Sequence, residues 1–157
     1  MTYIFMNCKM KSSAETSDTR LIYRVLDANL NRLREALRVI EEYYRFIDDR
    51  PETCATLKTL RHRLVGIEAA VGRAELLANR DATTDCFAGV NRPEELDRTG
   101  LDALLAANFK RGQEASRVIE EYAKMIAPPA GAQLSETAKS LRFALYTSEK
   151  DLLGGKG

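Results

Sequence analysis

The chain has 157 residues, and its 24 Lys and Arg residues nearly balance 23 Asp and Glu residues, giving a formal net charge of +1. This balance does not favour a general nucleic-acid surface, and hydrophobic residues at 45% are too many for a disordered chain. No stretch approaches the roughly 18 apolar residues of a membrane span. A single histidine, His62, and three scattered cysteines without a CxxC pair argue against a zinc enzyme and a disulfide framework. The N-terminal apolar run is too short for a signal peptide, so we expect a cytoplasmic protein.

Residues 1–15 are expected to form a mobile or extended lead-in to the first helix. Ser17 or Asp18 is placed to cap the start of that helix, and apolar residues then recur in alternating steps of four and three, the spacing of one helix face. This stripe consists of Leu26, Leu30, Leu33, Leu37, Ile40, Tyr44 and Ile47. Because proline disfavours helix at the residue before it, the first helix is predicted to end at Arg50.

The second predicted helix opens at Pro51, since proline is well tolerated at the first helical position, and it fades near Asn79. Its apolar stripe consists of Leu57, Leu60, Leu64, Ile67, Val71 and Ala74. Residues 80–100 show no sustained period and contain Gly, Pro, Asp, Thr and Asn. They are therefore interpreted as a long loop with a short helical turn at 93–96.

The third predicted helix covers residues 101–126 and stops at Pro128. The fourth begins at Ser135, and residues 154–157 form a tail. The stripe of the fourth helix consists of Ala138, Leu141, Leu145 and Leu152. No segment shows a convincing strand pattern, so the predicted fold class is all-α.

A segment of the first helix is repeated in the third. Residues 28–43 (ANLNRLREALRVIEEY) and 107–122 (ANFKRGQEASRVIEEY) are identical at eleven of 16 positions at an offset of 79, and the helices that follow them correspond at an offset of 81. We therefore predict four long helices arranged as two duplicated antiparallel hairpins with pseudo-twofold symmetry. The single domain, residues 16–153, then consists of repeat one at 20–79, the central loop at 80–100 and repeat two at 101–153.

Nine of the eleven repeated residues fall on one helix face, an arc of about 160°. A face made only for packing would be apolar, but this one has Arg32 near its centre, flanked by Asn29 and Glu35. The second copy repeats them as Asn108, Arg111 and Glu114. Two interpretations remain open and do not exclude each other. One is an internal ion-pair network of each arginine with the glutamate three residues on. The other is a polar cavity where the arginines bind an anionic ligand and the asparagines orient it.

Two smaller patterns carry charge. The repeated Arg38, with Glu41 or Glu42, is interpreted as a solvated helix face. The loop opening, RDATTD, supplies Arg80 to face a phosphate, and Asp81 and Asp85 to hold Mg²⁺, which prefers oxygen ligands. The alternative is a polar connection in which aspartate forms a turn. No Gly-rich phosphate loop and no nucleophile elbow is present.

The segments DANLNRLREALRVIEEYYRF, RDATTD and AANFKRGQEASRVIEEYAKM together resemble one family, over residues 20–153. It is the helical domain found N-terminal to thiamin phosphate synthase, also known as a stand-alone protein: the alternative, monofunctional hydroxymethylpyrimidine phosphate kinase. The loop departs from the family pattern at Cys86-Phe87-Ala88, which displaces Gly89. The 157 residues contain no synthase barrel.

The resemblance implies phosphorylation of hydroxymethylpyrimidine phosphate to its diphosphate in thiamin biosynthesis, with ATP as co-substrate and Mg²⁺. From the chemistry of these residues and the loop motif, we expect the six repeated polar residues to bind substrate, Asp85 and Arg80 to act in catalysis, and Asp81 and Asp85 to bind the metal. Two other functions remain open: a non-catalytic module that binds thiamin precursors or docks on thiamin phosphate synthase, and a structural bundle. A homodimer is expected because the first helix has more apolar surface than one hairpin partner covers, and neither nucleic acid nor a membrane is an expected partner.

Overall fold

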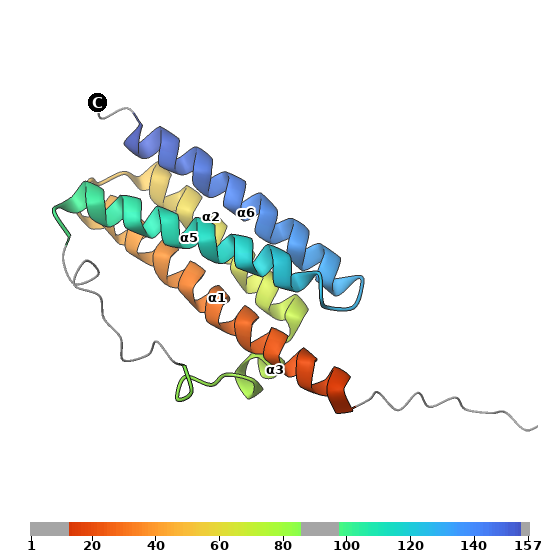
Figure 1. Ribbon diagram of the computed structural model, residues 1–157. Helices are drawn as coiled ribbons and strands as arrows, with labels where there is room; N and C mark the ends of the chain where they lie inside the picture. The colour runs from red at the N-terminus through yellow and green to blue at the C-terminus, as the bar shows by residue number, and fades with distance from the viewer. Residues whose placement is uncertain (1–12, 86–97, 155–157) are drawn as a thin grey trace, which may run out of the picture.

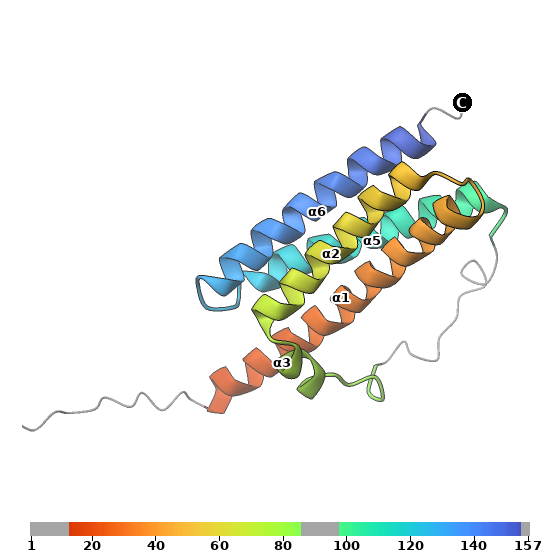
Figure 2. The same ribbon diagram turned by 180° about the vertical axis from the view of Figure 1, so that it is seen from behind.

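The computed structural model describes residues 13–85 and 98–154, and five helices lie within them. They are α1 (Ser13–Phe46), α2 (Pro51–Val71), α3 (Arg73–Ala78), α5 (Leu101–Ala123) and α6 (Ala130–Leu153). No strand occurs in this part of the chain, so the predicted all-α class is confirmed. The long helices α1, α2, α5 and α6 lie side by side, with the short α3 beside α1 (Figures 1 and 2).

The four long helices form a bundle in which each contacts two neighbours. α1 packs against α5 and α2, and α6 packs against α5 and α2. α1 and α2 run in opposite directions, as do α5 and α6 (Figure 1). Two antiparallel hairpins therefore lie against each other, with α1 and α5 forming the seam on one side.

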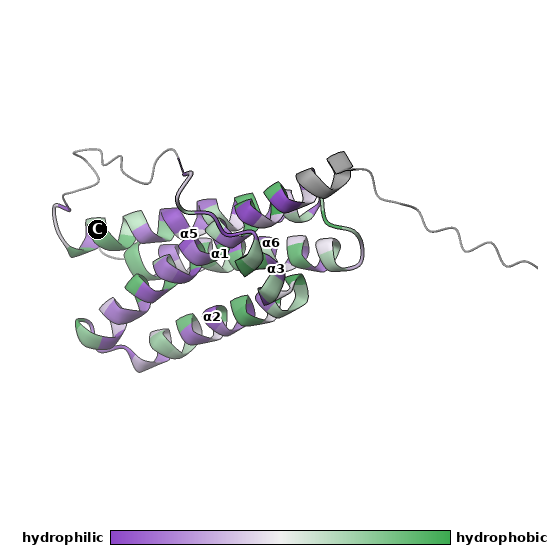
Figure 3. Ribbon diagram, turned by 90° about the horizontal axis from the view of Figure 1, so that it is seen from below, coloured by the Kyte–Doolittle hydropathy of each residue, from purple (hydrophilic) through white to green (hydrophobic). Residues whose placement is uncertain are grey.

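The predicted apolar stripes form the core. In α1 the stripe from Leu26 to Tyr44 is 0–1% exposed, and the green and purple patches of Figure 3 alternate along the helices. One face of each long helix is thus buried, and the opposite face is exposed to solvent. Ile47 is the exception at 55% exposed, because α1 ends one residue before it.

The bounds of α1 differ from the prediction at both ends. The helix begins at Ser13, so Ser17 and Asp18 lie inside it and neither caps it. At the other end, the main-chain N–H groups of Ile47 and Asp48 both donate to the Tyr43 carbonyl, which closes the helix in a tight turn. Pro51 opens α2 as predicted.

The predicted second helix is broken into two pieces. Gly72 has φ +97°, in the left-handed region that suits glycine, and the chain turns there between α2 and α3. As a result Ala74 of the predicted stripe is exposed, whereas Leu76 on α3 is buried against the bundle. The predicted fading near Asn79 is confirmed, since Asn79 follows the last residue of α3.

The second hairpin also differs in its bounds. α5 ends at Ala123 and is followed by a turn, and α6 begins at Ala130 rather than at Ser135. The helical turn predicted at 93–96 and the lead-in at 1–12 lie outside the described residues. Within the described residues, no helix is both long enough and apolar enough to cross a membrane.

Several side-chain contacts of the first hairpin recur in the second at the offsets of the sequence repeat. In each hairpin an asparagine bonds within its own helix, two helices are joined by a polar pair, and a buried glutamate meets an arginine and receives a bond on its carbonyl. These pairs of contacts are Asn29–Val25 with Asn108–Leu104, Arg34–Glu68 with Gln113–Glu149, Glu41–Arg61 with Glu120–Arg142, and Glu41–Cys54 with Glu120–Ser135. They support the predicted duplication, whereas a pseudo-twofold relation between the whole hairpins stays a prediction.

At one non-identical position, the two copies of the repeated helix complement each other in volume. Gly112 stands where the first copy has Leu33, and a Cβ atom at Gly112 would lie 3.6 Å from that Leu33 and 3.2 Å from Leu145. A large residue in one copy thus fills the space that a small residue leaves in the other, which is how close packing is kept across the seam.

Candidate functional site

A cavity of about 710 Å³ lies along the seam between α1 and α5. Five described residues from each helix line it: Asn29, Arg32, Glu35, Ala36 and Val39 from α1, and Asn108, Arg111, Glu114, Ala115 and Val118 from α5. Each α5 residue is the repeat of an α1 residue, and the residue type is the same in all five pairs. The structure therefore brings together all six side chains predicted to bind substrate.

Asn29 and Asn108 are the most buried polar residues of this lining, each only 6% exposed. The Nδ2 group of Asn29 donates to the Val25 carbonyl at 2.9 Å, and that of Asn108 donates to the Leu104 carbonyl at 2.8 Å. These bonds fix both amides on their helices. Among the described residues no donor reaches either Oδ1 atom, so each remains an acceptor for a ligand or a water molecule.

Arg32 and Arg111 lie on opposite helices and are both exposed. Among the residues that the structure describes, neither forms an ion pair, and Glu114 lies 3.9 Å from Lys110 instead. The predicted ion-pair network at these positions is therefore wrong: an arginine exposed to solvent needs no internal partner. Both guanidinium groups remain available to an anionic ligand.

The opening of the central loop is fastened to α1. Arg80 donates from Nε and Nη2 to the two carboxylate oxygens of Asp27, both at 2.7 Å, and Asp27 is 6% exposed. The hydrogen bonds and the charge of Asp27 raise the pKa of Arg80 further, so the guanidinium group stays charged. Arg80, which was predicted to act in catalysis, thus holds the start of the loop against α1. A contact between Arg80 and a phosphoryl group stays a prediction.

Asp81 is engaged within its own turn. Its Oδ1 accepts bonds from the Thr83 hydroxyl at 2.8 Å and the Thr83 main-chain N–H at 3.0 Å, and its Oδ2 accepts from the Thr84 hydroxyl at 2.6 Å. These bonds, that of the Thr84 hydroxyl above all, hold the pKa of Asp81 well below its usual range. Asp81 therefore stabilises a turn, as in the second of the two interpretations of the loop opening.

None of the three predicted loop residues lines the cavity. Asp85 is exposed at the end of the described part of the loop, and no group of three His, Cys, Asp or Glu side chains in the described ranges is placed to hold a metal ion. The loop position Cys86-Phe87-Ala88, which departs from the family pattern, lies outside those ranges.

A comparison with protein families settles the assignment of the chain. The model of the ThiD2 family matches residues 24–151, which include both copies of the repeated segment and the start of the loop. The chain belongs to the ThiD2 family.

Curated relatives of this ThiD2 chain are named thiamine-phosphate synthase. The chain is 43% identical over 143 residues to that of Thermosynechococcus vestitus, 42% over 135 residues to that of Synechocystis sp. and 38% over 135 residues to that of Nostoc punctiforme. These matches cover 91%, 86% and 86% of the chain but only 38%, 37% and 36% of the relatives. No solved structure matches it.

Sequence reasoning missed the buried polar pairs of this ThiD2 domain. Glu41 was interpreted as part of a solvated face, yet it is 6% exposed and its carboxylate lies 2.5 Å from Arg61 Nε. Glu120 repeats this with Arg142 at 2.7 Å. The repeat could have predicted these pairs, because Arg61 recurs as Arg142 at the offset of 81 and Glu41 recurs as Glu120 at the offset of 79. A cation and a carboxylate that are both repeated indicate an ion pair.

Proposed function

We propose that this ThiD2 chain phosphorylates hydroxymethylpyrimidine phosphate to its diphosphate, with MgATP as co-substrate, in thiamin biosynthesis. The observation that supports this best is the duplicated cavity, which is lined by two buried asparagines and by two arginines that form no ion pair with any described residue. Two phosphorylated substrates need two cationic groups to neutralise and align them. The names of the curated relatives support the pathway.

In the proposed reaction an oxygen of the monophosphate attacks the γ-phosphorus of ATP. A new phosphoanhydride bond forms as the bond from the γ-phosphorus to the bridging oxygen breaks, and ADP leaves. Arg32 and Arg111 bind the phosphate groups, and Asn29 and Asn108 accept hydrogen bonds from the substrate through Oδ1. The side chains thus supply position and charge, which are the main needs of phosphoryl transfer.

The magnesium ion arrives with ATP, and the carboxylates of the chain differ in whether their oxygens are free to bind it. Asp81 has both carboxylate oxygens engaged by Thr83 and Thr84, so it does not fit as an open ligand. Glu35 and Glu114 are exposed carboxylates in the cavity lining and suit a cation that keeps several waters and binds one or two carboxylates. Asp85 remains the proposed catalytic carboxylate, and Arg80 the residue that steadies the phosphoryl group.

The test is a coupled ADP-release assay with MgATP, comparing hydroxymethylpyrimidine phosphate with the unphosphorylated alcohol. We expect turnover on the monophosphate and none on the alcohol. Asp85→Asn should then abolish turnover while the protein remains folded, and full activity of this variant would reject the catalytic role of Asp85.

One observation favours a second candidate, a non-catalytic module that binds thiamin precursors or docks on thiamin phosphate synthase. Arg80 and Asp81 are both engaged with their own chain, and neither lines the cavity. If folded protein turns over neither substrate but binds the monophosphate in calorimetry, and Arg32→Ala weakens that binding, this candidate replaces the kinase.

A further inference from the structure

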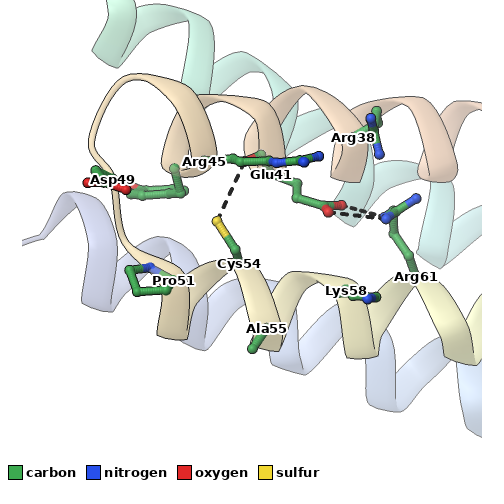
Figure 4. A pocket seen from close by; sticks show the side chains of 10 residues that line it. Arg38, Glu41, Arg45, Asp49, Pro51, Cys54, Ala55, Lys58 and Arg61 are labelled. Atoms are coloured by element: carbon green, nitrogen blue, oxygen red, sulfur yellow. Dashed lines mark hydrogen bonds and ion pairs between the residues drawn. The ribbon is translucent and has the colours of Figure 1, made fainter.

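A second cavity, of about 490 Å³, lies between the C-terminal part of α1 and the first turns of α2. Figure 4 shows Arg45 lying along α1, Cys54 pointing from α2 toward α1, and Glu41 and Arg61 meeting between the helices, and Lys58 of α2 also lines the recess. Its lining contains four cationic side chains and two carboxylates: Arg38, Arg45, Lys58 and Arg61 against Glu41 and Asp49. The cavity is therefore an electropositive recess that the proposed kinase reaction does not use.

The four cationic side chains differ in whether they form ion pairs. Arg61 pairs with the buried Glu41, and Arg38 pairs with Glu42. Among the described residues, no carboxylate pairs with Arg45 or Lys58; the Arg45 guanidinium rests 4.8 Å from the centre of the Phe46 ring. Two cationic side chains of the lining thus have no ion-pair partner in the described part of the chain, and guanidinium and ammonium groups both bind phosphate.

The second hairpin has a related cavity of about 500 Å³, with Lys124 and Lys139 at the positions of Arg45 and Lys58. There, however, Lys124 is bonded to Glu121 at 2.8 Å. Glu136 also lines it where the first cavity has Ala55. The first cavity therefore keeps the stronger positive field, and an anion is expected to prefer it.

The recess between α1 and α2 and the cavity between α1 and α5 share no lining residue. Arg38 and Glu41 point to one side of α1, and Val39 and Ala36 point to the other. A ligand in the recess between α1 and α2 would therefore leave the seam between α1 and α5 open.

We propose that this recess is a separate binding site for a phosphorylated small molecule, held through Arg45 and Lys58. Its volume lies within the range of small-molecule sites and exceeds what one phosphate ion needs. Pro51 and Ala55, which also line it, offer an apolar wall to the organic part of the ligand.

Cys54 provides a local reporter. Its thiol is partly buried in the recess, and burial, followed by the charge of Glu41, raises the pKa of the thiol. An anion bound beside Cys54 blocks access to the sulfur and disfavours the thiolate further. Occupation of the site should therefore slow alkylation of Cys54.

The experiment measures alkylation of Cys54 by iodoacetamide, with peptide mass spectrometry separating it from Cys8 and Cys86. Pyrophosphate and ADP are the probes, and sodium chloride of equal ionic strength is the control. At ten times the dissociation constant we expect Cys54 to react about 10-fold more slowly, because only about a tenth of the sites remain empty. Sodium chloride should have no such effect.

The double variant Arg45→Ala, Lys58→Ala should lose this protection, whereas Arg73→Ala, Lys150→Ala, which removes the same charge elsewhere on the surface, should keep it. Lys58→Arg should also keep it. Equal protection in the Arg45/Lys58 variant, or no protection of the unaltered chain by either probe, would overturn the proposal. Since Arg45 and Lys58 lie outside the α1–α5 cavity, ADP release in the kinase assay should survive in this variant, so the two proposals fail independently.

Discussion

Single residues decide how charge is distributed between the interior and the cavity. Glu120 is 6% exposed and receives two bonds from Arg142, at 2.7 and 3.2 Å to one carboxylate oxygen. A buried carboxylate that loses its cation keeps the full cost of desolvation. The repeated arginines on α2 and α6 are therefore structural, in contrast to the exposed Arg32 and Arg111.

Arg142→Ala should lower the free energy of unfolding by about 3 kcal/mol, because it leaves Glu120 buried with only the exposed Arg117 beside it. Arg117→Ala, which removes a half-exposed partner of the same Glu120, should cost less than about 1 kcal/mol. Urea denaturation of both variants measures the difference. Equal costs would mean that the buried pair is not what holds α5 to α6.

The bonds to Asp81 predict a pH dependence. Because the folded-state pKa of Asp81 is held below the value of about 3.9 in an unfolded chain, its contribution to stability is present above that value and is lost as the pH falls through the folded-state pKa. Asp81→Ala should therefore differ most from the unaltered protein at pH 5 and above, and the difference should shrink below about pH 4. Denaturant unfolding at several pH values measures this; a difference that grows on acidification would contradict the assigned bonds.

At the scale of elements, the break between α2 and α3 is what the apolar pattern could not predict. The stripe continues in register from Ile67 through Val71 to Ala74, and a lone glycine within a helical pattern is compatible with an unbroken helix. Only the geometry reveals that Gly72 turns the chain. The consequence reaches the loop, because the turn carries Arg80 to Asp27 on α1.

Two glycines of this region allow a matched test. Gly72→Ala places a side chain at φ +97° and should destabilise the fold by about 1–2 kcal/mol. Gly66→Ala, in the middle of α2, adds a Cβ with no atom within 4 Å and should stabilise it by up to about 1 kcal/mol through helix propensity. Urea midpoints should move in opposite directions. Two shifts of the same sign would mean that α2 and α3 are one helix in solution.

At the scale of the whole molecule, the sequence predicted the fold class and the four long helices, and the cavity was one of the two interpretations that it left open. The duplication indicated the cavity, because Asn29, Arg32 and Glu35 are identical in the second copy while the neighbouring leucines are replaced. Repeated apolar residues alone would have indicated only packing. The pairing of charges was less predictable, because helical spacing places Glu35 beside Arg32 as readily as it places Glu41 beside Arg38. Only the position of α2 shows that Glu41 turns inward to Arg61.

The roles of the loop residues depend on contacts that local sequence does not specify. A short run of Arg, Asp and Thr can bind a phosphate, hold a cation or make a turn, and the outcome depends on a partner distant in sequence. Asp27 is that partner for Arg80, and its repeat is Ala106. The described start of the loop is thus fastened to the first copy of the repeat, and the second copy has no carboxylate at the matching position.

The equivalence of Arg32 and Arg111 gives the last prediction. Since each is exposed and forms no ion pair with a described residue, Arg32→Ala and Arg111→Ala should each change the free energy of unfolding by no more than about 0.5 kcal/mol. If both bind phosphate groups, each should lower kcat/KM for hydroxymethylpyrimidine phosphate by about 10- to 100-fold, the loss of one charge-assisted hydrogen bond in the transition state. Arg73→Ala, an exposed arginine on α3 away from the cavity, serves as the control and should retain full activity. Steady-state kinetics and urea unfolding on the same preparations separate the two effects. A loss of stability with unchanged kinetics would assign the arginines to the bundle, whereas a loss of activity in only one variant would show that the two halves of the cavity have taken different roles.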